Sequence, residues 1–238
     1  MSIMEFIRKT GAHEFAKYID NTILKPDASL EIIRKYVDDT IKYKFQCLVV
    51  NPCHIGLVRE LSKASIRVGT VIGFPLGANR TEVKVFEARK AIEDGASEID
   101  MVMNISAFKS GNLDYVFNDI KAVVDEAKAH GDIVVKVIIE AGLLTDEEKV
   151  KAVEVIAKAG ADYVKTSTGF IAGGATIHDV RLLYEASKGR LKVKASGGIR
   201  HAEDAIAMIL AGADRIGTST GTKIIEEFIR LRNKLYKA

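Results

Sequence analysis

The sequence contains few of the residues that build disulfide frameworks and metal sites. Its two cysteines, Cys47 and Cys53, do not form a CxxC pair, so the chain fits a reducing compartment and no disulfide framework is expected. Its five histidines are scattered along the chain without the spacing of metal ligands. We therefore expect no metal site.

Long apolar runs and a strong excess of one charge are also missing. No segment approaches the length of a membrane span, and the first nine residues lack the long apolar core of a signal peptide. The 35 basic and 32 acidic residues leave a formal net charge of +3, which is too small to indicate a nucleic-acid partner. These absences favour a cytoplasmic enzyme with neither a membrane nor a nucleic acid as partner.

The sequence does contain a regular alternation of strand-like and helix-like segments, and no linker interrupts it. Strands are predicted at 18–24, 46–51, 67–74, 98–104, 133–140, 162–168, 192–196 and 214–219. Helices are predicted at 29–43, 54–64, 80–94, 112–130, 145–158, 176–188, 201–210 and 221–236. The alternation predicts one domain over residues 1–238, a (β/α)8 TIM barrel with an extra N-terminal helix. The alternative, a doubly wound sheet, would usually carry a G-x-G-x-x-G motif after its first strand, and none is present.

Local signals support these boundaries. The segments 94–100, 159–165 and 211–217 share one pattern, in which a helix ends at a glycine suited to the left-handed conformation and a strand starts at once. The predicted helix N-caps are Ser29, Asn79 and Thr145, and Glu148 completes a capping box with Thr145.

Three of the charged residues that interrupt otherwise apolar strands are candidates for the chemistry. Lys165 and Lys194 lie near the ends of the sixth and seventh strands, where burial and a neighbouring ammonium would lower a lysine pKa and leave a neutral, nucleophilic amine. Asp100 lies in the fourth strand between Ile99 and Met101. It is either a proton-handling group at the barrel mouth or the partner of a structural ion pair.

Glycine-containing turns follow the seventh and eighth predicted strands. Ser196-Gly197-Gly198-Ile199-Arg200 and Gly217-Thr218-Ser219-Thr220-Gly221 each lead from a strand into a helix, which is the common phosphate site of such barrels. Thr168 and Gly169 follow Lys165 and offer further polar groups. An amine nucleophile, a carboxylate and a phosphate cradle together suit imine chemistry on a phosphorylated carbonyl compound.

Other polar positions are ambiguous. Lys136 breaks the fifth strand and could pair with Asp100 or Glu140. Asp20 could contact the mouth or serve as a structural anchor, and Cys47 is interpreted as a small buried apolar residue.

With these motifs, the chain resembles the deoxyribose-phosphate aldolases, which are class I aldolases. The resemblance extends from Asp20-Asn-Thr-Ile-Leu-Lys-Pro26 to the turn at 217–221, and its most specific marks are Glu98-Ile-Asp-Met-Val-Met-Asn104, Val164-Lys-Thr-Ser-Thr-Gly-Phe170 and Val193-Lys-Ala-Ser-Gly-Gly-Ile-Arg200. It implies reversible cleavage of 2-deoxy-D-ribose 5-phosphate to D-glyceraldehyde 3-phosphate and acetaldehyde, in deoxyribonucleoside breakdown, without a cofactor. A homo-oligomer, dimer or tetramer, is expected.

The resemblance also implies residue roles. Lys165 would form the Schiff base, Lys194 would lower its pKa, and Asp100 would act with ordered water in proton transfer at the enamine carbon. Thr168 would lie near the substrate hydroxyls. The phosphate would be surrounded by Gly169, Gly197, Gly198, Arg200, Gly217 and Ser219.

The sequence departs from some relatives at three positions. Asn21 stands where many have histidine, Phe170 stands where some have a basic residue, and Tyr236 is not the last residue. We assign no catalytic role to Asn21, and the sequence leaves open whether Tyr236 reaches the active site. The alternative functions are another phosphosugar aldolase or a transaldolase, an isomerase with Asp100 as base, and a non-catalytic phosphometabolite-binding protein.

Overall fold

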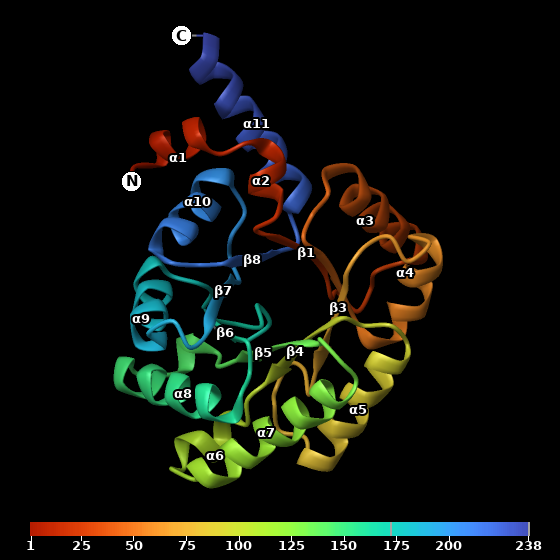
Figure 1. Cartoon of the computed structure of the whole chain (residues 1–238), viewed down its shortest axis with the longest axis vertical. Helices are drawn as coiled ribbons and strands as arrows, with labels where there is room; N and C mark the ends of the chain where they lie inside the picture. Colours follow the sequence, from red (N-terminus) through yellow and green to blue (C-terminus); the bar gives the residue numbers. More distant parts are fainter. Residues whose placement is uncertain (172, 238) are drawn as a thin grey trace.

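The computed structural model describes residues 1–171 and 173–237 and contains a closed barrel of eight parallel strands (Figure 1). Each strand pairs with the next, and β1 pairs with β8 to close the barrel. The strands are β1 (Ile19–Ile23), β2 (Cys47–Val50), β3 (Val68–Ile72), β4 (Glu98–Val102), β5 (Val134–Ile138), β6 (Tyr163–Lys165), β7 (Lys192–Ser196) and β8 (Arg215–Thr218). The predicted (β/α)8 barrel is confirmed.

Helices surround the barrel, and every predicted helix is present with small shifts at its ends (Figure 1). They are α3 (Leu30–Tyr43), α4 (Ile55–Leu61), α5 (Thr81–Glu93), α7 (Leu113–Ala129), α8 (Asp146–Ala159), α9 (Ile177–Ser187), α10 (Ala202–Ala211) and α11 (Gly221–Lys237). The short α6 (Ile105–Lys109) and the 3₁₀ turns η1 (Pro52–His54) and η2 (Ala141–Leu143) are additional. They occupy loops where no amphipathic period is long enough to be seen in the sequence.

The N-terminal extension is helical, as expected, but consists of two short helices, α1 (Ile3–Lys9) and α2 (Ala12–Ala16). The backbone is extended at Thr10 and Gly11 between them, and both residue types are weak helix formers. Phe15 of α2 stacks on Phe228 of α11 with ring centroids 4.1 Å apart. The extension therefore packs against the last helix (Figure 1).

Tyr236, near the end of α11, lies far from the mouth of the barrel. The hydroxyl of Tyr236 donates a hydrogen bond to the carbonyl of Arg8, and about fifteen residues of helix, roughly 22 Å, separate it from the start of α11 at Gly221. The structure thus places Tyr236 on the N-terminal extension. None of the described helices combines the length and the apolar character needed to span a bilayer.

Helix ends follow most of the predicted signals. Thr145 and Glu148 form the capping box of α8, and Ser29 caps α3. The prediction for Asn79 is wrong, because Arg80 occupies the N-cap position of α5. Gly160 and Gly212 end α8 and α10 in the left-handed conformation, as the repeated pattern predicts.

Candidate active site

A cavity of about 400 Å³ opens where the carboxyl ends of β1, β6, β7 and β8 meet. This volume suits a small metabolite. Lys165 reaches the cavity from β6. Every residue predicted to bind substrate or phosphate lines the same cavity, namely Thr168, Gly169, Gly197, Gly198, Arg200, Gly217 and Ser219.

The turn after β7 has the backbone geometry of an anion cradle. Gly197 and Gly198 have consecutive positive φ values of 90° and 79°, a conformation that side chains disfavour and that can turn successive backbone N–H groups toward one ligand. The N-terminus of α10 is less available to bind an anion, because the Glu227 carboxylate already accepts a hydrogen bond from the backbone N–H of Ala202 at 3.0 Å. The cradle is therefore the glycine turn together with the start of α11, which begins two residues after Ser219.

Strand register brings the charged residues together. Lys165 and Lys194 are direct partners across β6 and β7, and Asp100 and Lys136 are direct partners across β4 and β5. Since side chains alternate between the two faces of a strand, direct partners share a face. The barrel interior therefore receives Lys165, Lys194, Asp100 and Lys136 at neighbouring positions.

Asp100 is the centre of this group. Its Oδ2 accepts hydrogen bonds from Lys165 Nζ at 2.7 Å and from Lys194 Nζ at 2.8 Å, and its Oδ1 accepts one from Lys136 Nζ at 2.9 Å. All four side chains are buried, with Lys165 the most exposed at 4%. Of the two partners weighed for Lys136, Asp100 is confirmed. The second partner is Glu98, at 2.6 Å, and not Glu140.

The lysines have opposite pKa shifts. The pKa of Lys165 is lowered to about 8, chiefly by burial. The Asp100 carboxylate acts to raise this pKa, whereas the ammoniums of Lys194 and Lys136 lower it further. Burial acts in the same direction on Lys194, but the Asp100 and Asp20 carboxylates outweigh it and raise its pKa. Near neutral pH, Lys165 is therefore the amine that loses its proton most easily.

The Asp100 carboxylate is held ionised. Burial alone would raise its pKa, but Lys136, Lys165 and Lys194 together hold the pKa well below its usual range. The sequence left two interpretations of Asp100, a proton-handling group or the partner of a structural ion pair, and its position is compatible with both. It is ion-paired, and it lies against the lysine that reaches the cavity.

Two further residues shape the site. An added Cβ at Gly217 would lie 3.0 Å from Lys194 Cε, so glycine gives Lys194 the room to reach Asp100. At the end of β5, Glu140 accepts hydrogen bonds from the backbone N–H and the hydroxyl of Thr168. Glu140 therefore orients the turn that carries Thr168 into the cavity.

Sequence reasoning missed some residues of the site. Lys25 lines the cavity directly after β1, and its position after a strand end was the available signal. Glu98 and Arg215 lie inside the barrel at the first positions of β4 and β8; both belong to segments singled out in the sequence, but neither was assigned a role. Phe170 lies at the cavity edge and packs edge-on against Phe74 with ring centroids 5.1 Å apart.

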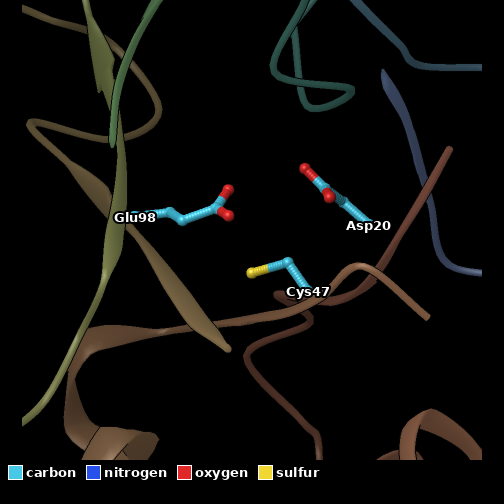
Figure 2. Close-up of side chains that lie close together, drawn as sticks. All are labelled: Asp20, Cys47 and Glu98. Carbon is cyan, nitrogen blue, oxygen red and sulfur yellow. The ribbon is translucent and has the colours of Figure 1, made fainter. Parts of the chain in front are cut away.

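Asp20, Cys47 and Glu98 point toward one another inside the barrel (Figure 2), and their ligand-type atoms lie within 4.8 Å of one another. Spacing along the chain did not predict this cluster. Its chemistry does not suit a cation, because Lys194 and Arg215 already pair with Asp20, and Lys136 pairs with Glu98. Burial also raises the pKa of the Cys47 thiol well above its usual range. Cys47 is fully buried, as the sequence predicted.

A second cluster lies at the surface, where Asp146, His178 and Asp179 approach one another. The ammonium of Lys149 occupies its centre, 3.0 Å from Asp146 Oδ1 and 2.6 Å from Asp179 Oδ1. A lysine that neutralises both carboxylates fills the position that a cation would need.

The chain is similar to aldolases over most of its length. The DeoC/LacD aldolase family matches residues 15–227. A deoxyribose-phosphate aldolase of Caldanaerobacter subterraneus subsp. tengcongensis is 55% identical over 214 residues, which cover 90% of this chain and 93% of the relative. One from Thermococcus gammatolerans is 56% identical over 216 residues, covering 90% and 96%.

Solved structures agree with this similarity. The tetrameric deoxyribose phosphate aldolase from Aeropyrum pernix superposes with a TM-score of 0.89 at 37% identity. The match covers 96% of each chain.

Proposed function

The chain belongs to the DeoC/LacD aldolase family, and from this premise we propose that it cleaves 2-deoxy-D-ribose 5-phosphate reversibly to D-glyceraldehyde 3-phosphate and acetaldehyde through a Schiff base on Lys165. The observation that carries the proposal is the pairing of a low-pKa lysine with a glycine cradle in one cavity. The names of the relatives, which are deoxyribose-phosphate aldolases, support the choice of substrate.

In the proposed mechanism, the neutral Lys165 amine attacks the C1 aldehyde of the open-chain sugar, and loss of water leaves a protonated imine. When the C3 hydroxyl loses its proton, the C2–C3 electron pair moves toward the imine nitrogen. The bond breaks, glyceraldehyde 3-phosphate leaves, and an enamine of acetaldehyde remains on Lys165. Protonation at C2 and hydrolysis of the imine release acetaldehyde and restore the amine.

Lys194 and Asp100 are proposed to handle the proton at C2, through a water molecule. Lys194 is suited to remain charged because two carboxylates raise its pKa. Asp100 contacts both lysines through one oxygen, Oδ2. It is therefore placed to orient Lys194 toward C2, the carbon next to the one bound to Lys165.

The phosphate is proposed to bind at Gly169, Gly197, Gly198, Arg200, Gly217 and Ser219, with Thr168 near the substrate hydroxyls. Lys25 adds a second cation at the same cavity. Binding the phosphate away from the reacting carbon positions C1 at Lys165 and supplies binding energy for the chemical step.

The proposal extends to the setting of the enzyme. We place it in deoxyribonucleoside breakdown in the cytoplasm, which is supported by the unpaired state of Cys47 and Cys53. A homo-oligomer is supported by the tetrameric relative from Aeropyrum pernix. Light scattering on the purified protein would test the oligomeric state.

The experiment that tests the function is borohydride trapping with acetaldehyde, followed by peptide mass mapping and a cleavage assay. We expect an ethyl adduct on Lys165 and release of glyceraldehyde 3-phosphate from deoxyribose 5-phosphate. An adduct on Lys194 or Lys136 would overturn the assignment of the nucleophile. Turnover without any adduct would contradict the imine mechanism, and binding without turnover would indicate a phosphometabolite-binding protein.

A further inference from the structure

The barrel interior contains a closed ring of six charges of alternating sign. Its members come from β1, β4, β5, β7 and β8, and none of the six side chains is more than 8% exposed. Around the ring, Asp100 contacts Lys136, Lys136 contacts Glu98, Glu98 contacts Arg215, Arg215 contacts Asp20, Asp20 contacts Lys194, and Lys194 contacts Asp100. We call these residues the charge ring.

The charge ring is neutral without Lys165. Its three carboxylates balance two ammoniums and one guanidinium, so each charge has partners of opposite sign on both sides. Lys165 joins the ring only through Asp100 Oδ2, an oxygen that Lys194 already contacts. A proton on Lys165 therefore adds a positive charge that no carboxylate of the charge ring is left to balance.

Glu98 and Arg215 lie on the far side of the charge ring. They open strands β4 and β8 at the N-terminal end of the barrel, whereas the cavity lies at the other end. Their guanidinium–carboxylate contact is 3.2 Å long. Arg67, which is 57% exposed, approaches Glu98 from outside the ring at 3.5 Å.

We propose that Glu98 and Arg215 are positioning residues that keep the charge ring neutral and thereby leave Lys165 as the lysine that reacts as a free amine. They touch neither the cavity nor Lys165, so their influence is carried by Asp20, Lys136, Lys194 and Asp100. This inference rests on the proposed role of Lys165 as the imine-forming residue.

The test below compares variants of the charge ring. The other ionisable groups around the barrel interior and the mouth are the same in all of these variants, so their effect on the reactivity of Lys165 cancels when the variants are compared. These groups are Lys25 after β1, Cys47 in β2, Glu140 after β5, Tyr163 in β6 and Arg200 after β7. The residues of β3 (Val68–Ile72) include no charged side chain.

Two single substitutions change the net charge of the ring in opposite directions. Glu98→Gln leaves one excess positive charge and is expected to make Lys165 react at lower pH. Arg215→Gln leaves one excess negative charge and is expected to move the reaction to higher pH. Each midpoint is expected to shift by about half a pH unit or more, because buried charges interact across a weakly screening interior.

The neighbours keep partners in both variants. Without Glu98, Lys136 retains Asp100 and Arg215 retains Asp20. Without Arg215, Glu98 retains Lys136, and Asp20 retains Lys194. A double variant, Glu98→Gln with Arg215→Gln, restores a neutral ring and is expected to return the midpoint toward that of the wild type.

The readout is the rate at which acetaldehyde and cyanoborohydride label Lys165, mapped by mass spectrometry across a pH series, alongside the pH profile of cleavage. Arg67→Gln is the matched control, because it removes a contact of Glu98 outside the ring and should leave the midpoint unchanged. Arg215→Lys keeps the charge and should also keep the wild-type midpoint. Thermal melting identifies the variants that fold.

Opposite shifts in the single variants and recovery in the double variant would support the inference. Midpoints that stay at the wild-type value, or move in the same direction in both folded single variants, would overturn it. If either single variant does not fold, Asp20→Asn and Lys136→Met impose the same two charge changes elsewhere in the ring, and the same opposite shifts are required. Absence of labelling on Lys165 in the wild type would instead refute the proposed imine mechanism.

Discussion

Replacement of Lys194 by methionine removes one of the two ammoniums that share Asp100 Oδ2. The Lys165 and Lys194 nitrogens lie 2.7 and 2.8 Å from that oxygen, so they cannot be more than about 5.5 Å apart. In Lys194→Met the positive charge is lost while a long apolar side chain still fills much of the space. The pKa of Lys165 should therefore rise.

The size of this rise follows from the distance. Two unit charges at about 5.5 Å interact by roughly 3 kcal/mol at an effective dielectric constant of about 20. Since one pKa unit corresponds to about 1.4 kcal/mol, the pKa of Lys165 should rise by roughly 2 units. The wild-type value is about 8. The acidic limb of the activity profile, below which Lys165 is protonated and unreactive, should therefore move toward pH 10 in the variant.

The assay is the pH dependence of kcat/KM for cleavage of deoxyribose 5-phosphate, which reports ionisation of the free enzyme. Lys192→Met is the matched control, because Lys192 precedes Lys194 by two residues on the same strand but is exposed. The control should keep the wild-type profile. Lys165 labelling by acetaldehyde and cyanoborohydride should shift to higher pH in parallel with cleavage in Lys194→Met.

An unchanged midpoint in folded Lys194→Met would refute the electrostatic reasoning. A fall in activity at every pH with no change of midpoint would show that Lys194 acts in proton transfer alone. A shift of equal size in Lys192→Met would show that the general charge of the strand, and not the shared oxygen, controls Lys165.

Three other predictions follow from the site and from the buried ion pairs. Lys165→Met should abolish cleavage and acetaldehyde labelling while thermal melting shows a folded protein; retained turnover would contradict the proposed nucleophile. Arg200→Met removes one charge-assisted contact to the phosphate and should lower kcat/KM for deoxyribose 5-phosphate about tenfold or more. The kcat/KM for unphosphorylated deoxyribose should stay unchanged. Equal losses for both substrates would place Arg200 outside the phosphate site. Lys84→Met should lower the free energy of unfolding by about 3–5 kcal/mol, because it leaves the fully buried Asp119 carboxylate without its 2.6 Å ammonium partner. Denaturant melts would measure this loss, and kcat of the folded Lys84→Met variant should match that of the wild type.

Strand and helix positions could be read from the sequence because they depend on local patterns. Every predicted strand overlaps an observed one, and β7 matches its prediction at both ends, but the other predicted strands extend one to three residues too far at their carboxyl ends. The clearest case is β6, which ends at Lys165, whereas the sequence pattern continues to residue 168. Beyond Lys165 the chain leaves the sheet, and Thr168 and Gly169 line the cavity, so the conformation there follows the site and not the strand propensity.

The cavity lining could be predicted for a similar reason. In a parallel barrel, every strand directs its carboxyl end to the same face, so turns after different strands must meet there. Thr168, Gly197 and Ser219 could therefore be assigned to one site without coordinates. Lys25 was overlooked because a single lysine after a strand has no distinguishing neighbours in the sequence.

The alternation of strand and helix, the location of Lys165, Lys194 and Asp100 in buried strands, and the glycine turns after the last strands could all be predicted from the sequence. These features depend on residue type and on spacing along the chain. Which charges pair with one another became known only from the folded barrel. The pairing of Lys136 with Glu98, and of Arg215 with Asp20 and Glu98, depends on strand register and on closure of the barrel between β1 and β8. A shift of one residue in register would turn these side chains to the opposite face, and composition and periodicity do not specify register across strands distant in the chain.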